Sequence, residues 1–317
     1  MNNKRLNNVI KTEYLLLITC LFLFILSIVY FYQKKASLSD NNLIEKVESL
    51  YNNIFIYKDA TNRRHMIFGY RNRNFIESIH NPQDTLELPA PYTRFMTMGV
   101  LYAADLKSML FIGMGGGKTS SYMQAFIPEL HIMEVELDPD VVKLAKKYFD
   151  FQETPRLTVS INDGRKFLMQ SDGQYDLIML DAYRGPFVPF HLLTVEFYQE
   201  VKKHLKPGGV VVQNIEPSTM LFDSTVATIA KVFDQVEFYP ADGNVITVAY
   251  DGRQPANEVL REKAILLQKK YHFRYALPNM LDKRTFFRPQ PTIMPLTDDF
   301  APVDSLKAIE KHNKKWE

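Results

Sequence analysis

The strongest constraint on the fold is a regular alternation of strand and helix patterns between residues 109 and 215. The apolar run MLFIG leads through a glycine-rich loop into a helix pattern. The same order returns in HIMEVEL with DPDVVKLAKKYF, in LTVSI with a short helix from Arg165, in DLIMLD with TVEFYQEVKKHL, and ends in GVVVQNI. Repeated βαβ units predict a parallel sheet wound on both faces by helices. Two later strand patterns, VEFYP and NVITVAY, are expected to add an antiparallel edge.

Segments of a different character flank this α/β unit, which we place at residues 99–250. Residues 51–98 hold short alternating runs, such as RRHMIFGY and NFIESIH, followed by a proline-marked loop, and they predict a small antiparallel β unit. The polar stretch at 36–50 is helix-compatible and is expected to be a connector. Residues 251–317 contain one helix pattern, EVLREKAILLQKKY, and an irregular tail that we expect to pack on the core.

The N-terminus carries an uncharged apolar run from Tyr14 to Tyr32, close to the ~20 residues that span a bilayer as a helix. A cleavable signal peptide would have a shorter apolar core of about 7 to 15 residues and a small-residue cleavage site. The following QKKASLSD offers no such site. Residues 1–35 are therefore predicted to be an uncleaved, single-pass membrane anchor. Its orientation is not set by charge, because Lys and Arg balance on its two sides.

The overall charge argues against nucleic acid as a partner. The 317 residues have a formal net charge of +2, and Lys and Arg are spread along the chain without a long basic run. Cys20 is the single cysteine, so no intramolecular disulfide can form. Because no pair of His or Cys residues shows metal-ligand spacing, no metal site is expected.

The glycine loop in MLFIGMGGGKTSSYM decides which ligand the parallel sheet is expected to bind. A phosphate-binding Walker loop has four residues between its first glycine and the Gly-Lys-Ser/Thr, whereas only three separate Gly113 from Gly117 here. The dinucleotide pattern G-x-G-x-x-G matches Gly113 and Gly115, but its third glycine falls on Lys118. The loop is too short for a triphosphate, and its partial match equally describes nucleoside binders.

Acidic residues stand at the carboxyl ends of the next three strand patterns. Glu136 follows the loop near the ~20-residue spacing at which a carboxylate reaches the ribose hydroxyls of a nucleoside. Asp163, with Gly164 beside it, can accept a hydrogen bond from an adenine amine, and Asp181 ends DLIMLD. Ligands of open α/β sheets bind outside these strand ends, so the pattern predicts one nucleoside crevice. The alternative for Glu136 is that it only bonds its own turn.

The chain resembles the spermidine synthase family, the polyamine aminopropyltransferases, and especially a branch joined to membrane segments. The matching motifs are FIGMGGGKT, VELDPDVVKLAKKYF, NDGRKFL, YDLIMLDAYRGP, LLTVEFYQEVKKHLKPGGVVVQN and LTDDFAPV. The resemblance covers most of the chain from about Asn53. It implies a Rossmann-like, S-adenosylmethionine-dependent methyltransferase fold and a donor of that type. In aminopropyl transfer the donor would be decarboxylated S-adenosylmethionine and the nucleoside product methylthioadenosine.

On the donor side, the resemblance carries over well. The residues that match the family's nucleoside-binding positions are Gly113, Gly115, Gly117, Glu136, Asp163, Gly164 and Asp181. Two tyrosines match the family's amine pocket: Tyr92 in APYTRFM and Tyr239 in FYPADG.

The acceptor side departs from the family's pattern. Where the family's glycine loop has an acidic residue, this chain has Gly116. Where the family has its catalytic acid, three residues after the strand-end aspartate, this chain has Arg184. Thr93 and Arg94 also occupy positions at which the family shows polar or acidic residues. Aminopropyl transfer needs a carboxylate that binds the amine and takes its proton. A guanidinium reverses the sign of that pocket and suits an anionic group. The alternative is that Arg184 simply faces solvent.

The residues expected to act on the acceptor are Asp181, Arg184, Tyr92 and Tyr239. His191, in PFHLLT, is either a general base near neutral pH or a packed loop residue. Asp298 and Asp299, in LTDDF, either return acids to the site or cap a turn.

Three functions stay open at this point. The leading hypothesis is a membrane-anchored transferase of the spermidine synthase type. The alternatives are an S-adenosylmethionine-dependent methyltransferase acting on an anionic or neutral acceptor, and a non-catalytic nucleoside sensor or membrane scaffold. The expected partners are a small-molecule acceptor and the membrane, and the sequence is compatible with a homodimer. Because adenosyl donors are made in the cytosol, the globular part is expected to face the cytoplasm.

Overall fold

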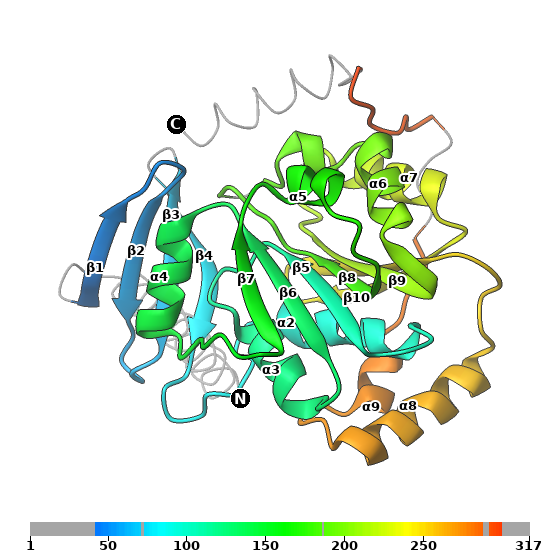
Figure 1. Cartoon of the computed structure of the whole chain (residues 1–317), viewed down its shortest axis with the longest axis horizontal. Helices are drawn as coiled ribbons and strands as arrows, with labels where there is room; N and C mark the ends of the chain where they lie inside the picture. The colour runs from blue at the N-terminus through cyan, green and yellow to red at the C-terminus, as the bar shows by residue number, and fades with distance from the viewer. Residues whose placement is uncertain (1–41, 71–72, 186, 288–291, 300–317) are drawn as a thin grey trace, which may run out of the picture.

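The computed structural model describes residues 42–70, 73–185, 187–287 and 292–299. Its main sheet contains β5 (Ser108–Ile112), β6 (His131–Glu136), β7 (Leu157–Ile161), β8 (Tyr175–Leu180), β9 (Leu205–Ile215), β10 (Gln235–Ala241) and β11 (Asn244–Tyr250). The strand order is β10-β11-β9-β8-β5-β6-β7 (Figure 1). Strands β5 to β9 pair in parallel, whereas β11 pairs antiparallel with β9 and β10. The predicted parallel sheet and its antiparallel edge are confirmed.

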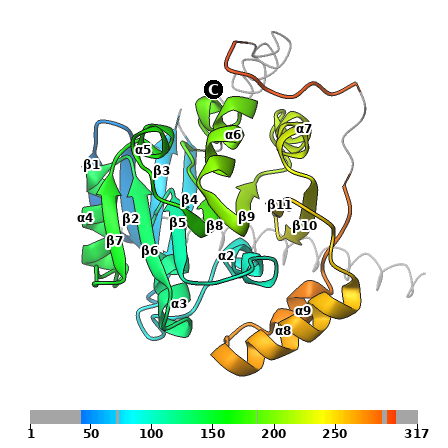
Figure 2. The same cartoon turned by 45° about the vertical axis from the view of Figure 1, so that its right-hand side comes forward.

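Helices cover both faces of this sheet. They are α2 (Pro91–Met96), the 3-10 helix η2 (Thr97–Leu101), α3 (Lys118–Phe126), α4 (Pro139–Tyr148), α5 (Gly164–Gln170), the 3-10 helix η3 (Phe190–Leu192), α6 (Val195–Lys203), α7 (Phe222–Val232), α8 (Asn257–Tyr271) and α9 (Leu277–Leu281). Figure 2 shows α2, α3, α8 and α9 on one side and α5, α6 and α7 on the other. Because side chains alternate along a strand, Met109 and Phe111 pack on the first side and Leu110 and Ile112 on the second.

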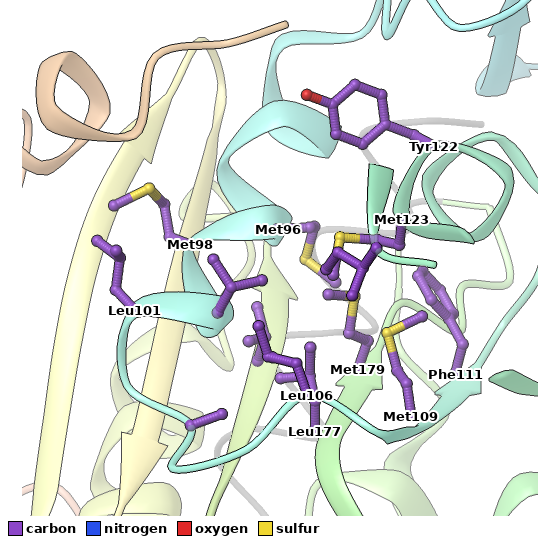
Figure 3. Packing of buried hydrophobic residues seen from close by; sticks show 14 of the residues in the cluster. Met96, Met98, Leu101, Leu106, Met109, Phe111, Tyr122, Met123, Leu177 and Met179 are labelled. Atoms are coloured by element: carbon purple, nitrogen blue, oxygen red, sulfur yellow. The ribbon is translucent and has the colours of Figure 1, made fainter. Parts of the chain in front are cut away.

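The core on the α2 and α3 side is rich in methionine (Figure 3). Met96 and Met98 come from α2 and η2, and they join Met109, Met123 and Met179 in one fully buried cluster. Unbranched methionine side chains fill irregular space between the short helices and the sheet. This packing fixes α2, the helix that carries Tyr92.

A second, antiparallel sheet precedes the α/β unit. It contains β1 (Leu43–Glu48), β2 (Asn53–Lys58), β3 (Arg64–Tyr70) and β4 (Arg73–His80), in the order β1-β2-β3-β4. The small β unit is therefore confirmed, but Leu43–Glu48, within the stretch at 36–50 expected to be a helix-compatible connector, form β1. The physical reason is its alternation, since every second residue of LIEKVE is exposed and the strand pairs along the edge of β2.

Helix α4 joins the two sheets. Val141 and Leu144 pack on Ile54 and Ile56 of the small sheet, while Ala145 belongs to the core of the main sheet. In Figure 1, α4 lies between the small sheet and β7. The amphipathic helix thus has two apolar contacts, and it holds the small sheet beside the main one.

The predicted membrane span, Tyr14 to Tyr32, lies outside the described residues and stays a prediction. In the part of the chain that the structure describes, no helix has the length and apolar character needed to cross a membrane.

Candidate functional site

A pocket of about 920 Å³ lies at the carboxyl ends of β5, β6 and β8. The winding of the sheet reverses here, because β6 and β7 extend it on one side of β5, and β8 and β9 on the other. Ligands of doubly wound sheets bind at such a switch point. Strand β4 of the small sheet and helix α2 also line the pocket. Both sheets therefore contribute to one site.

The glycine loop is held close to the end of β8. Gly113 has a φ of 95°, and a Cβ added there would lie 2.5 Å from the carbonyl carbon and oxygen of Asp181. Only glycine tolerates both conditions. Gly113 and Gly115 line the pocket, whereas Gly117 precedes α3 and is not among the described residues that line it.

Lys118 begins α3 and lines the pocket. Its buried ammonium donates to the carbonyl oxygens of Thr85, at 2.6 Å, and Phe149, at 3.3 Å. Burial lowers the pKa of Lys118 to about 8. Two of its hydrogen bonds thus tie the start of α3 to the segments around Thr85 and Phe149.

Glu136 ends β6 in the lining of the pocket. Its carboxylate accepts from the N–H of Met114 at 3.1 Å and from the N–H of Asp138 at 2.9 Å. It therefore bonds its own turn and also the glycine loop. Burial raises its pKa, and the N–H groups of Asp138 and Met114 oppose that rise. Each carboxylate oxygen has a further lone pair, which leaves capacity for ribose hydroxyls.

Asp163 lines the pocket as the N-cap of α5. Its Oδ1 accepts from the N–H of Lys166 at 2.9 Å, and its Oδ2 lies 2.8 Å from Nε2 of His191. The hydrogen bond with His191 holds the pKa of Asp163 below its usual range. His191 thus lies beside the predicted adenine contact, which the sequence did not indicate.

Asp181 lines the pocket directly after β8. Its Oδ1 accepts from Nδ2 of Asn214 at 2.9 Å, and its carboxylate also bonds the hydroxyl of Tyr92. Burial raises the pKa of Asp181 to about 7, although the bonds from Asn214 and Tyr92 oppose the rise. Near neutral pH this carboxyl group can both hold and release a proton, which is the property of a general acid or base.

Two further acids of the pocket lay outside every sequence motif: Glu77 in β4 and Glu216 just after β9. Glu216 accepts from the hydroxyl of Ser218 at 2.5 Å. The only signal for Glu77 is its place in NFIESIH, where Ile76 is 51% exposed and the acid takes the inward position. Among the described residues, no group of three His, Cys, Asp or Glu side chains is arranged to hold a metal ion.

Of the other residues considered for the acceptor side, the structure places Arg184 in the described pocket lining and Tyr239 and Arg94 outside it. Arg184 lines the pocket and is exposed. Tyr239 is fully buried with its hydroxyl 2.5 Å from that of Tyr102, and it is not among the described residues that line the pocket. Arg94 donates from Nε to the carbonyl oxygen of Leu88 at 2.7 Å, so its role is in the loop before α2.

The C-terminal acids do not enter the described lining of the pocket. Asp298 accepts from both terminal nitrogens of Arg165, at 2.7 and 2.5 Å, and from the hydroxyl of Thr194 at 2.7 Å. Asp299 is exposed. Asp298 therefore fastens residues 292–299 to the starts of α5 and α6, a bidentate contact that neither predicted alternative anticipated.

Comparison with known proteins agrees with this architecture. Residues 91–249 match the family model of the spermine/spermidine synthase domain. A polyamine aminopropyltransferase from Vibrio vulnificus is 30% identical over 285 residues, which cover 86% of this chain and 93% of that protein. The chain belongs to the spermine/spermidine synthase family. Membership of the spermine/spermidine synthase family makes the protein a transferase.

Solved structures share the fold. A probable spermidine synthase from Corynebacterium glutamicum has a TM-score of 0.64 at 19% identity and covers 81% of this chain and 97% of its own. Human Methyltransferase-like protein 13, solved in complex with SAH, has a TM-score of 0.53 at 23% identity and covers 64% of this chain and 97% of its own. The Rossmann-like methyltransferase fold that the sequence predicts is thereby confirmed for this member of the spermine/spermidine synthase family.

Proposed function

We propose that the protein transfers the aminopropyl group of decarboxylated S-adenosylmethionine to a small amine. The observation that carries the proposal is the composition of the pocket at the carboxyl ends of β5, β6 and β8. Residues suited to a nucleoside, Glu136 and Asp163, share it with Asp181, a buried carboxyl group able to take a proton near neutral pH. Supporting likenesses are the Vibrio vulnificus aminopropyltransferase and the SAH complex of the human methyltransferase-like protein.

In the proposed donor complex the nucleoside lies across the carboxyl ends of β5, β6 and β7. Glu136 accepts hydrogen bonds from the ribose hydroxyls. Asp163 accepts a hydrogen bond from the adenine amine, which either replaces the contact with His191 or is added to it. The glycine loop lets the backbone approach the sulfur end of the ligand because Gly113 has no side chain. The transferred chain then points toward Asp181 and Tyr92.

The proposed reaction is a displacement at the carbon next to the sulfonium. Asp181 accepts a proton from the acceptor's ammonium, since only the free amine has a lone pair. The amine nitrogen forms the new C–N bond, the C–S bond breaks, and its electron pair stays on sulfur, so methylthioadenosine leaves uncharged. Tyr92 and Asn214 hold Asp181 in place throughout, through the hydrogen bonds already described.

Arg184 favours a second candidate function. Its guanidinium lines the same pocket and stays charged at any ordinary pH, so it suits a carboxylate. That group would be either the α-carboxylate of S-adenosylmethionine or an anionic acceptor. The corresponding activity is methyl transfer from the intact donor.

The two functions differ in the group transferred and are separated by mass spectrometry. The full chain, kept in a mild detergent, is incubated with either donor and a panel of diamines, polyamines and carboxylate-bearing acceptors. We expect an aminopropylated amine and methylthioadenosine from the decarboxylated donor. Methylated product from S-adenosylmethionine alone would replace the proposal by the methyltransferase, and donor binding without any product would favour a nucleoside sensor.

The uncharged run Tyr14 to Tyr32 supports a further proposal, that the protein is anchored in a membrane with its globular part in the cytoplasm. Adenosyl donors are available on that side. A reporter fused after Glu317 should be active only in the cytoplasm and should fractionate with membranes. Activity of the reporter outside the membrane would overturn the orientation, and recovery in the soluble fraction would overturn the anchor.

A further inference from the structure

Glu77 is an acidic residue of the pocket lining that has a buried side-chain oxygen without a hydrogen-bond partner among the described residues. It lies in β4, and it lines the pocket while its neighbour Ile76 faces outward. Its Oε1 is shielded from solvent, and no donor among the described residues bonds this atom. Leaving a buried polar atom without a partner costs about 1–3 kcal/mol, more when it is charged. A ligand that donates to Glu77 would remove this cost.

The backbone around Glu77 fixes it beside the glycine loop. The next residue, Ser78, accepts from the N–H of Gly116 at 2.8 Å. A Cβ on Gly116 would lie 2.6 Å from the ring of Phe149 and 3.0 Å from Cβ of Ser78. The space in which a loop side chain would extend from Gly116 is therefore filled. An acid that acts near this loop has to come from another element, and β4 supplies one.

The charges that face Glu77 come from several elements. Asp181 follows β8, Glu136 ends β6 and Glu216 follows β9, and burial together with these three carboxylates raises the pKa of Glu77 well above its usual range. Tyr92 of α2 faces the same group, and the described pocket lining also contains two cations, Lys118 at the start of α3 and Arg184 after β8. An excess of acids over cations attracts a ligand that carries an ammonium and repels one that carries a carboxylate.

Resting on the proposed function, we infer that Glu77 binds the terminal ammonium of the donor's aminopropyl chain and discriminates against the α-carboxylate of S-adenosylmethionine. Methylthioadenosine has neither group and therefore senses only the nucleoside part of the pocket. The bound ammonium favours the charged form of Glu77, so binding of the decarboxylated donor releases a proton and tightens as the pH rises. Selectivity for the donor thus comes from the small sheet.

The test is isothermal calorimetry of the full chain and of Glu77→Gln with decarboxylated S-adenosylmethionine, S-adenosylmethionine and methylthioadenosine. Glutamine keeps the shape but loses the charge. We expect the affinity for the decarboxylated donor to fall about tenfold or more, while the affinity for methylthioadenosine stays within about twofold. Titrations in buffers of different ionisation enthalpy should show that fewer protons are released when Glu77→Gln binds the decarboxylated donor than when the parent protein does.

Glu45→Gln is the matched control. It makes the same change on β1 of the same sheet, where Glu45 bonds Lys147 and Tyr148 away from the described pocket lining. This variant should bind all three ligands as the parent does.

The outcomes separate this inference from the proposed function. If the parent binds the decarboxylated donor no better than S-adenosylmethionine, the proposed function fails and the inference with it. If the parent prefers the decarboxylated donor and Glu77→Gln keeps the same preference, only the role of Glu77 is overturned. An equal loss of all three ligands, including methylthioadenosine, would show that Glu77 only shapes the pocket and would also overturn it.

Discussion

Asp181 is the residue whose protonation sets the expected pH dependence of the reaction. Its pKa is raised to about 7 by burial, so the carboxylate form, which is proposed to accept the acceptor's proton, becomes populated as the pH rises through that value. We expect kcat/KM to increase from about pH 6 to about pH 8, because the pH dependence of this ratio reports the pKa values of groups in the free enzyme. Asp181→Asn should lower kcat by about 10² to 10⁴ and remove this limb. Retention of the same limb in the variant would assign it to another group.

The same residue also affects stability. A carboxyl group whose pKa is raised in the folded state stabilises the fold below its unfolded pKa, and that contribution is lost as the pH rises through the folded pKa. For Asp181 the window runs from the ordinary aspartate pKa of 3.8 to about 7. Without ligand, the free energy of unfolding should therefore fall less steeply across this window in Asp181→Asn than in the parent. Denaturant titrations at several pH values measure this difference, and identical slopes would contradict it.

Among the individual residues of the pocket, those at strand ends could be predicted from the sequence, whereas the position of Glu77 in the pocket could not. Glu136, Asp163 and Asp181 follow from a rule that ties strand ends to ligands, and all three line the pocket. Glu77 could not be found in this way, because its position depends on how β4 packs against the glycine loop. Tyr239 matches by sequence order alone, and its pairing with Tyr102 directs its hydroxyl into a buried contact.

At the scale of elements, the contact between β4 and the glycine loop explains why the loop carries Gly116. Ser78 and Phe149 occupy the space next to it, so a larger residue would force them apart. We expect Gly116→Asp to lower the free energy of unfolding by about 1–3 kcal/mol, the usual effect of overpacking. Thermal and denaturant unfolding measure the change. Unaltered stability with unaltered donor affinity would mean that the loop and β4 are less tightly packed than described.

Element types were predicted well where the pattern was long. The parallel strands and α4, α6 and α8 appear where strand and helix periods indicated them. The stretch before Ser49 was misjudged because its polar residues suit both a helix surface and an edge strand. Pairing with β2 decides in favour of β1, and pairing partners are not visible in a local pattern.

At the scale of the whole molecule, one pocket joins an α/β domain to a small antiparallel sheet. The main sheet supplies the residues proposed to bind a nucleoside, while β4 supplies Glu77 and α2 supplies Tyr92. Helix α4 packs on both sheets and holds this arrangement together. The sequence predicted both units, but their shared pocket depends on contacts between residues far apart in the chain, such as Ser78 with Gly116.

The most direct test of this account is the affinity of the full chain for methylthioadenosine, measured by calorimetry for the parent, Glu136→Gln and Glu134→Gln. Glu134 is buried on the same strand, outside the described pocket lining, and burial raises its pKa to about 8, so glutamine replaces a group that is already largely neutral. We expect the parent and Glu134→Gln to bind alike and Glu136→Gln to bind about tenfold or more weakly. Equal affinity in all three proteins, or no binding by the parent, would contradict the placement of a nucleoside in this pocket.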